Sequence, residues 1–523
     1  MNAAMKENHN RIRCGAARQA LLATLLIALS GPAVAQPKGA LVFASPILSQ
    51  HADPTAMVST ADYLVSDMIY DGLINLGPQG KYPALAESWQ ISADGKQVDF
   101  KLRKGVRFHN GDPFTADDVK FTFERIIAAD STHSYRRGFQ DSLERVDVVD
   151  PLVARFILKN PWPAFFTTAR YALTHIVPRK YYEKLGPKGF REKPVGTGPF
   201  RLVEMKGGEW TRFEAYDGYW AGAPKVKTIT QRLVAEPFTR YAMLERGEAD
   251  IASGLTGPLL EKTRTNKDFR VFTSNYSGTS GILVNKKLFP ESADRRVRLA
   301  IAHAIDRKGI SDNLLRGVCE PASSIFTPGT FGYLDGLPQI AYDPAKARAL
   351  LKEAGIKPGH KVSFTFHTQS FASFPAAPQV LEAIAGNLES VGFAVERRIV
   401  DTDGWMSMMR GGKHPGIYYT PSGTPDDGGE LINTWFHSNS AWTAKTIQIP
   451  EYDQLFRSQM QNADPAARLR QLQDFARMEH ERLELVPLLW CGTPYVAGKR
   501  VKTWKPALAS GYNLNFDELE LND

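Results

Sequence analysis

Residues 83–123 (PALAESWQISADGKQVDFKLRKGVRFHNGDPFTADDVKFTF) constrain the fold more than any other stretch of this chain. The Asp94-Gly95 pair is a strong hairpin signal, and residues 98–102 alternate apolar and polar side chains as a half-buried strand does. Thr115 then precedes acidic residues, the arrangement that favours a helix N-terminus. The stretch therefore predicts a compact α/β module.

Predicted strands and helices alternate along the whole chain, from a buried strand at residues 40–44 to a late apolar strand at 486–491. A helix at residues 344–353, closed by Gly355, is typical of the elements between them. Such alternation indicates α/β lobes with parallel or mixed sheets. A chain of 523 residues exceeds what one core usually supports, so two or more lobes are expected. Because no low-complexity linker separates them, we expect crossing strands and a ligand cleft between the lobes.

The first 35 residues resemble an export signal. Four basic residues precede an apolar run at residues 20–29, and residues 33–35 (AVA) form a small-x-small cleavage site. The run is too short for a typical membrane span, which is the alternative interpretation. Cys14 precedes the run, whereas the lipid-bearing cysteine of a lipoprotein follows it. We therefore expect a soluble periplasmic protein, secreted across the inner membrane and cleaved after Ala35.

The charge pattern argues against a nucleic-acid partner. The formal net charge is +8, and removing residues 1–35, with four basic residues and one acid, leaves +5. Acids and bases are interspersed without a long basic run, which favours solubility rather than nucleic-acid binding.

Two cysteines would remain after cleavage, Cys319 and Cys491. A pair in an oxidising compartment can form a disulfide, but distance in sequence says nothing about geometry. Two separate buried thiols are the alternative, and the sequence leaves both open.

Several ordered blocks resemble the family 5 solute-binding proteins of ABC importers, which bind dipeptides, oligopeptides and nickel. The blocks are residues 69–73 (IYDGL), 83–123, 196–200 (GTGPF), 240–251 (RYAMLERGEADI), 298–310 (RLAIAHAIDRKGI), 342–355 (YDPAKARALLKEAG) and 387–392 (NLESVG). A single block would be weak, but their shared order along the chain makes the resemblance specific.

The resemblance implies an α/β fold, the two-lobed periplasmic binding protein of type II, cluster C, with an extra subdomain in lobe one. Lobe one would comprise residues 36–275 and 488–523, with the inserted subdomain at about 75–185, and lobe two residues 276–487. It also implies that a monomer clamps a peptide or peptide-like ligand between its lobes and delivers it to the transmembrane permease subunits of an ABC importer.

The resemblance also suggests where a peptide's amino end would bind. Peptide-binding relatives use an aspartate after an aromatic-rich strand, and the corresponding stretch here is residues 418–430 (YYTPSGTPDDGGE). The usual aspartate position falls near Thr424, with Asp426 and Asp427 just beyond it. Either carboxylate would suit an ammonium group in a closed cleft. Alternatively, both acids only form a turn with the glycines that follow.

A second segment departs from the dipeptide binders. They hold the ligand carboxylate with an arginine in a segment that corresponds to residues 368–378 (TQSFASFPAAP), which here contains neither Arg nor Lys. This departure speaks against simple dipeptides. Gln369 and Ser370 could hydrogen-bond a neutral polar solute and Phe371 could stack against it, unless the segment is only a mobile surface loop.

The remaining candidates lie where the lobes are expected to meet. Tyr418 and Tyr419 either line the cleft or belong to a core strand, where their hydroxyls would need partners. The crossing segments and the loop after the first strand supply the other candidates, Tyr276, Ser277, Gly278, Thr279, Trp490, Ser49, Gln50 and His51. Such aromatic faces, with amide and hydroxyl groups, suit opines and sugars.

No catalytic, metal or phosphate motif accompanies these residues. The sequence lacks a G-x-S-x-G elbow, a His-Glu-x-x-His pair and a C-x-x-C motif. No Gly-Lys pair is followed by Ser or Thr, so residues 195–200 (VGTGPF) predict a tight turn rather than a phosphate loop. We expect a binding protein without catalytic activity, cofactor or built-in metal. Alternatives are a binder of an opine, an oligosaccharide conjugate or a chelated metal, or a sensory or chaperone-like protein outside transport.

Overall fold

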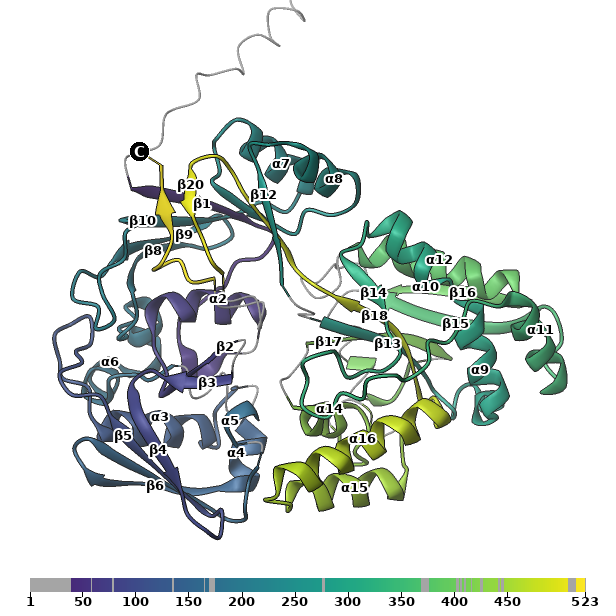
Figure 1. Cartoon of the computed structure of the whole chain (residues 1–523), viewed down its shortest axis with the longest axis horizontal. Helices are drawn as coiled ribbons and strands as arrows, with labels where there is room; N and C mark the ends of the chain where they lie inside the picture. The colour runs from purple at the N-terminus through teal and green to yellow at the C-terminus, as the bar shows by residue number, and fades with distance from the viewer. Residues whose placement is uncertain are drawn as a thin grey trace, which may run out of the picture.

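The computed structural model shows two lobes joined by two chain crossings (Figure 1). It describes residues 39–522 except 58, 78–79, 134–135, 164, 169–174, 275–277, 368–375, 401–403, 405–406, 409–410, 415, 424–426, 441–442, 444–445 and 507–513. The predicted export signal lies outside the described residues. Among the described residues, no helix combines the length and the apolar character that a membrane crossing requires.

Lobe one is built on a seven-stranded mixed sheet in the order β12-β19-β11-β1-β10-β9-β8. In chain order the strands are β1 (Ala40–Ser45), β8 (Phe200–Lys206), β9 (Trp210–Ala215), β10 (Thr228–Leu233), β11 (Ile251–Ser253), β12 (Arg270–Thr273) and β19 (Pro494–Ala497). The central strand β1 runs parallel to β10 and β11, as expected for an α/β lobe.

Helices and short strands complete lobe one. They are η1 (Pro54–Ala56), α2 (Thr60–Ile69), the hairpin β2 (Ile74–Gly77) and β3 (Gly80–Pro83), α6 (Arg179–Glu192), α7 (Pro237–Glu245), α8 (Gly257–Thr265), β20 (Val501–Thr503) and β21 (Glu520–Leu521). The predicted tight turn at residues 195–200 packs on the end of α2. A Cβ on Gly196 would lie 2.1 Å from the carbonyl oxygen of Ile69, so only glycine allows this approach.

The stretch at residues 83–123 belongs to a subdomain with its own core. Its four-stranded sheet has the order β4-β5-β7-β6, and its elements are β4 (Ala86–Ile91), β5 (Gln97–Leu102), α3 (Ala116–Ile127), α4 (Arg136–Ser142), β6 (Leu143–Asp150), β7 (Val153–Leu158) and α5 (Phe165–Thr168). The predicted hairpin, strand and helix start are confirmed. The Asp118 carboxylate accepts the Thr115 backbone N–H at 2.9 Å, which caps α3.

Lobe two contains a six-stranded sheet in the order β14-β18-β13-β17-β15-β16. Its strands are β13 (Gly278–Val284), β14 (Cys319–Pro321), β15 (His360–His367), β16 (Phe393–Val400), β17 (Ile417–Gly423) and β18 (Leu485–Cys491). The helices are η2 (Pro290–Ala293), α9 (Arg295–Ala304), α10 (Arg307–Gly309), η3 (Ile310–Leu314), α11 (Pro344–Glu353), α12 (Ala377–Ser390), α14 (Gly428–Trp435), α15 (Pro450–Met460) and α16 (Pro465–Arg482).

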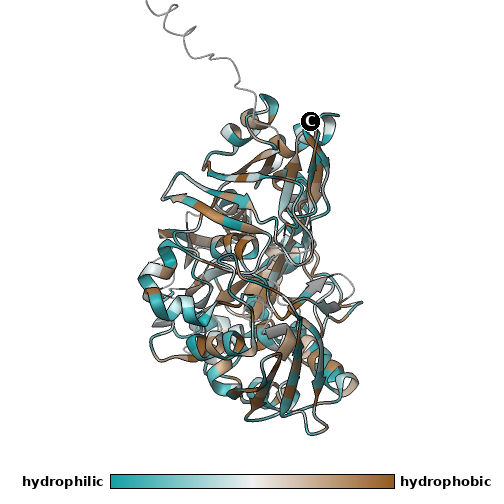
Figure 2. Cartoon of the chain, turned by 90° about the vertical axis from the view of Figure 1, so that its left-hand side faces the viewer, coloured by the Kyte–Doolittle hydropathy of each residue, from teal (hydrophilic) through white to brown (hydrophobic). Residues whose placement is uncertain are grey.

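Helices cover both faces of the lobe-two sheet. Helices α9, α11 and α12 pack on one face and α14, α15 and α16 on the other (Figure 1). Figure 2, viewed from the lobe-one side, shows hydrophobic and hydrophilic residues mixed along the helices and strands, because each element has a core side and a solvent side. Both faces of the central strands are therefore buried.

Candidate functional site

The candidate site lies where the edges of the two large sheets face one another. In lobe two, β15, β16, β17 and β18 all finish at the edge where β13 begins, because β13 runs antiparallel to β17 and β18. Gly278 is paired there with Gly423 on one side and Cys491 on the other. Loops that leave these strand ends are brought to one place, as in other open α/β sheets.

Lobe one presents a matching edge. Strands β1, β10, β11 and β12 end there, and β19 begins there, with Thr273 opposite Pro494. The loop after β1 leaves the same edge. Ser49 is buried, and its hydroxyl donates to Asp62 at 2.5 Å, so this predicted candidate already stabilises the loop. Gln50 is exposed and His51 half-buried, which leaves both available to a solute.

The two crossings run side by side. The backbone N–H of Ser274 donates to the Thr493 carbonyl oxygen at 3.0 Å, and the Thr493 N–H donates to the Ser274 hydroxyl at 2.7 Å. A Cβ on Gly492 would lie 2.3 Å from the Ser274 carbonyl oxygen, so the approach depends on glycine. The two hydrogen-bonded crossings therefore form a short hinge between the lobes.

A disulfide fixes the lobe-two side of this hinge. Cys319 on β14 and Cys491 on β18 are directly opposed and bonded, which decides between the two alternatives left open by the sequence. Because Cys491 is the last residue of β18, the bond attaches the start of the second crossing to the edge strand.

Tyr418 and Tyr419 do not line the cleft in this structure. Both rings are fully buried in the core, and as neighbours on β17 they point to opposite faces of the sheet. Burial raises the pKa of the Tyr418 phenol to about 12, and its hydroxyl lies 3.2 Å from the Thr446 hydroxyl. The core-strand alternative therefore describes both residues.

Trp490 and Thr279 are cross-strand partners beside the hinge. The Trp490 indole N–H donates to the Ser324 carbonyl at 2.8 Å, and its ring is almost completely buried. Thr279 is equally buried, but its hydroxyl has no hydrogen-bond partner among the described residues. A buried hydroxyl without a partner is uncommon, but burial keeps the Thr279 hydroxyl out of reach of a solute in this arrangement, as it does for Tyr418 and Tyr419.

Asp427 forms a buried, two-bonded ion pair near this edge. Its carboxylate accepts both terminal guanidinium nitrogens of Arg468 at 2.6 Å, and both side chains are 3% exposed. It also accepts the Gly429 backbone N–H at 2.9 Å, as the N-cap of α14. The turn-forming alternative is thus the observed one for Asp427, with a buried arginine added.

The other predicted candidates lie outside the described residues. These are Tyr276, Ser277, Gln369, Ser370, Phe371 and Asp426. Gly278, the remaining member of the set, starts β13 at the cleft edge.

Arg468 was missed by the sequence interpretation. On α16 it shares one face with Leu472, Phe475 and Ala476, at the spacing of an amphipathic helix. A charged residue within an apolar stripe indicates a buried partner, so the signal was present in the sequence. The identity of that partner, 41 residues earlier in the chain, was not.

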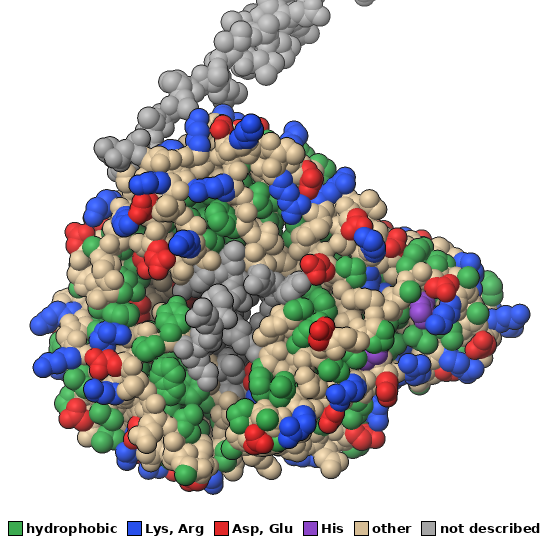
Figure 3. Space-filling model, viewed as in Figure 1, with side chains coloured by type: hydrophobic (Ala, Val, Ile, Leu, Met, Phe, Trp, Pro, Cys, Tyr) green, Lys and Arg blue, Asp and Glu red, His purple; other side chains and the backbone are tan. Residues whose placement is uncertain are grey.

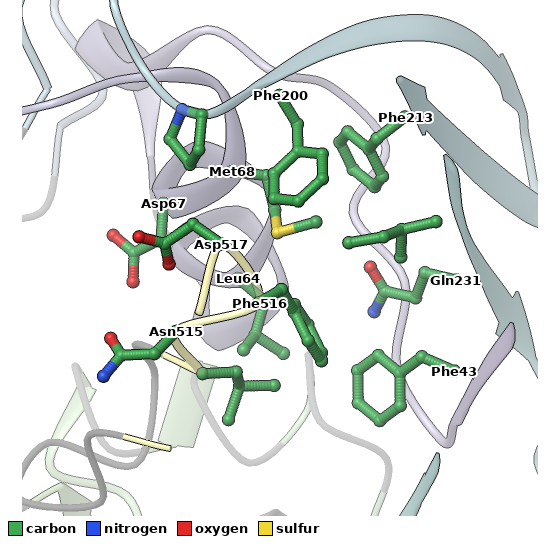
Figure 4. A pocket seen from close by; sticks show the side chains of 13 residues that line it. Phe43, Leu64, Asp67, Met68, Phe200, Phe213, Gln231, Asn515, Phe516 and Asp517 are labelled. Atoms are coloured by element: carbon green, nitrogen blue, oxygen red, sulfur yellow. The ribbon is translucent and has the colours of Figure 1, made fainter. Parts of the chain in front are cut away.

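The molecule contains both a cavity between the lobes and a smaller cavity within lobe one. The inter-lobe cavity measures about 390 Å³, and Phe331, Asp427 and Arg468 form its lobe-two wall. The cavity within lobe one, between α2 and residues 514–517, measures only about 20 Å³ (Figure 4). That is room for about one water molecule, so of these two cavities the inter-lobe space is the one that suits a solute.

Charged side chains and possible metal ligands bear on where a solute or an ion could bind. In Figure 3 hydrophobic side chains border the groove on the lobe-one side, whereas basic and acidic residues are dispersed over that face. Within the described part of the chain, no three His, Cys, Asp or Glu residues are grouped so that they could hold a metal ion.

Comparison with known proteins adds a family assignment. Residues 81–443 match the family model for "Bacterial extracellular solute-binding proteins, family 5 Middle". Over 503 residues the chain is 28% identical to di/tripeptide-binding protein 2 of Pseudomonas aeruginosa, covering 90% of this chain and 93% of that protein. Over 414 residues it is 30% identical to the glutathione-binding protein GsiB of Shigella dysenteriae, covering 74% and 78% respectively.

Solved structures share the two-lobed fold. The structure of NikA from Brucella suis in complex with Fe(III)-EDTA matches with a TM-score of 0.82 at 24% identity, covering 93% of this chain and 100% of that chain. At this identity the match speaks for the fold and not for the solute.

Proposed function

This chain belongs to family 5 of the bacterial extracellular solute-binding proteins, and we propose that it carries a peptide or peptide-like solute to the permease of an ABC importer. The observation that supports the proposal is the meeting of two strand-end edges over a hinge of two adjacent crossings. A solute that contacts both edges stabilises the closed arrangement by its differential affinity for it.

The peptide class is favoured by the relatives. Among the similar proteins are one named for di- and tripeptides and one named for glutathione, itself a peptide. The absence of Arg and Lys from residues 368–378 favours longer peptides, or solutes with a neutral end, over dipeptides. A free carboxylate left unpaired in a desolvated cleft costs on the order of several kcal/mol.

An opine is the second candidate solute. The same lack of a cationic residue in residues 368–378, together with the exposed amide of Gln50, would suit a polar solute without a terminal carboxylate in that position. The cellular setting belongs to the proposal too: export with cleavage after Ala35, residence in the periplasm as a monomer, and docking of the closed form on the permease.

The solute class can be tested by native mass spectrometry and calorimetry. Protein purified from the periplasm without refolding is expected to retain a solute with peptide bonds, and Ala-Ala is expected to bind with a Kd weaker than about 1 mM. Micromolar binding of Ala-Ala would contradict the exclusion of dipeptides. A retained solute without peptide bonds would replace the peptide by the opine class.

A further inference from the structure

We propose that the inter-lobe cavity is a subsite for an apolar, preferably aromatic, side chain of the carried peptide. The inference rests on the proposed function and deepens it, because it names a chemical preference at one place in the cleft. The inserted subdomain, whose role the family assignment leaves open, supplies one wall of this cavity.

Residues of both lobes line the cavity. Ile91, Trp162, Phe165 and Phe166 line it from the subdomain, and Phe331 and Arg468 line it from lobe two. Its volume of about 390 Å³ lies within the range of small-molecule sites. Any group that fills it touches both lobes at once, and therefore favours the closed arrangement.

The subdomain wall is aromatic and held rigidly by its own core. The rings of Trp162 and Phe165 are 5.4 Å apart at 71°, and those of Phe165 and Phe166 are 5.1 Å apart at 80°. These edge-to-face contacts present ring surface to a guest whose side chain is itself aromatic. The wall also contains an unused donor, since the Trp162 indole N–H has no acceptor among the described residues.

The lobe-two wall is electrically balanced. The Arg468 guanidinium lies 5.3 Å from the Phe331 ring centroid, and both of its terminal nitrogens donate hydrogen bonds to the Asp427 carboxylate. Its Nε donates to the Gln459 side-chain oxygen at 2.9 Å. Because the charges of Arg468 and Asp427 compensate each other, the wall favours neither an anion nor a cation. An apolar guest is the class that this cavity suits.

The contact between lobes beside the cavity supports this assignment. Met460, the last residue of α15, packs against the hydrophobic cluster of the subdomain. The lobes therefore already meet through apolar groups at this end of the cleft, and an apolar side chain in the cavity would extend that contact.

The test is a calorimetric panel of tetra-alanine and its four variants with a single phenylalanine. We expect one phenylalanine position to bind about 10- to 100-fold more tightly than tetra-alanine, since burial of a phenyl group removes much apolar surface from water. The other positions should change the affinity little, because the cavity lies at one end of the cleft.

Two variants test whether the preference for phenylalanine depends on the cavity. Ile91→Glu places a charge in the cavity wall, whereas Val149→Glu is a matched control on the same subdomain sheet, equally exposed at 51% and outside the cavity. Ile91→Glu should remove the phenylalanine preference, so that the phenylalanine peptide binds no more tightly than tetra-alanine. Val149→Glu should retain the preference, and thermal melts should show both variants folded.

The outcomes separate the two proposals. Peptides that bind without any phenylalanine preference, or a preference that Ile91→Glu and Val149→Glu reduce equally, would overturn the subsite and leave the carrier function intact. If no tetrapeptide binds, the peptide assignment fails and the subsite fails with it.

A third variant, Ile91→Trp, fills the cavity without introducing a charge and should abolish the preference. Retention of the preference in this variant would also overturn the subsite.

Discussion

Glu479 is a carboxyl group enclosed by lobe two, and burial raises its pKa to about 8. The Tyr452 hydroxyl and the Leu485 backbone N–H both donate to it, which opposes the shift, and the neighbouring Glu484 adds to it. The folded protein therefore holds a proton on Glu479 over a pH range in which the unfolded chain has released it.

The pH dependence of stability follows from that proton. Because the folded pKa exceeds the ordinary value of 4.5, the stabilisation from Glu479 is complete below about pH 4.5 and is lost as pH rises through about 8. The Glu479→Gln variant keeps an uncharged side chain of the same shape. We expect wild type to lose, relative to this variant, on the order of a few kcal/mol between pH 5 and 9.

Chemical denaturation at several pH values measures this difference. Glu481→Gln, an exposed neighbour on the same helix, is the control and should parallel wild type. A constant difference between wild type and Glu479→Gln across this pH range would show that the carboxyl is already ionised in the folded state.

At the scale of elements, the β14–β18 pair determines how firmly the second crossing is attached. Cys319 and Cys491 are 172 residues apart, and their bond closes a long loop of the unfolded chain. Such a bond stabilises the folded state mainly by restricting the unfolded one. Without it, the short edge strand β14 would depend on its backbone hydrogen bonds and on packing.

Reduction should therefore lower the melting temperature. The Cys319→Ala/Cys491→Ala double variant is expected to lose about 2–5 kcal/mol of stability and to become insensitive to reductant. A non-reduced digest should contain one linked peptide that carries both cysteines. Two alkylated free thiols in protein denatured without reductant would contradict the bond.

At the scale of the whole molecule, the hinge consists of two chain crossings that are hydrogen-bonded to each other. Gly492 allows their close approach. Because the Ser274 N–H donates to the Thr493 carbonyl oxygen and the Thr493 N–H donates to the Ser274 hydroxyl, rotation of the lobes must be accommodated within a few residues. A solute between the sheet edges then acts on the relative position of the lobes rather than on their internal structure.

Solute binding should make the molecule more compact. Small-angle scattering is expected to give a smaller radius of gyration with a saturating tetrapeptide from the panel than with a non-binding dipeptide, because the lobes approach each other. An unchanged radius of gyration at saturation would argue against a clamp in solution.

The sequence predicted the elements better than the site. The hairpin at Asp94-Gly95, the helix start at Thr115 and the helix α11 were all predictable, because each depends on residues a few positions apart. The site residues were harder to predict. Alternation along β17 indicates two faces, but it cannot tell that helices cover both of them and bury Tyr418 and Tyr419.

The sequence by itself determined the α/β class, the two-lobed family fold and the local turns, since short-range patterning and ordered motifs carry that information. Only the tertiary structure decided that Asp427 pairs with Arg468, that Cys319 bonds Cys491, and that Ile91 and Phe331 face one cavity. The residues of these pairs are 41 to 240 positions apart in the sequence. They depend on sheet order, register and the approach of the lobes, which no local pattern encodes.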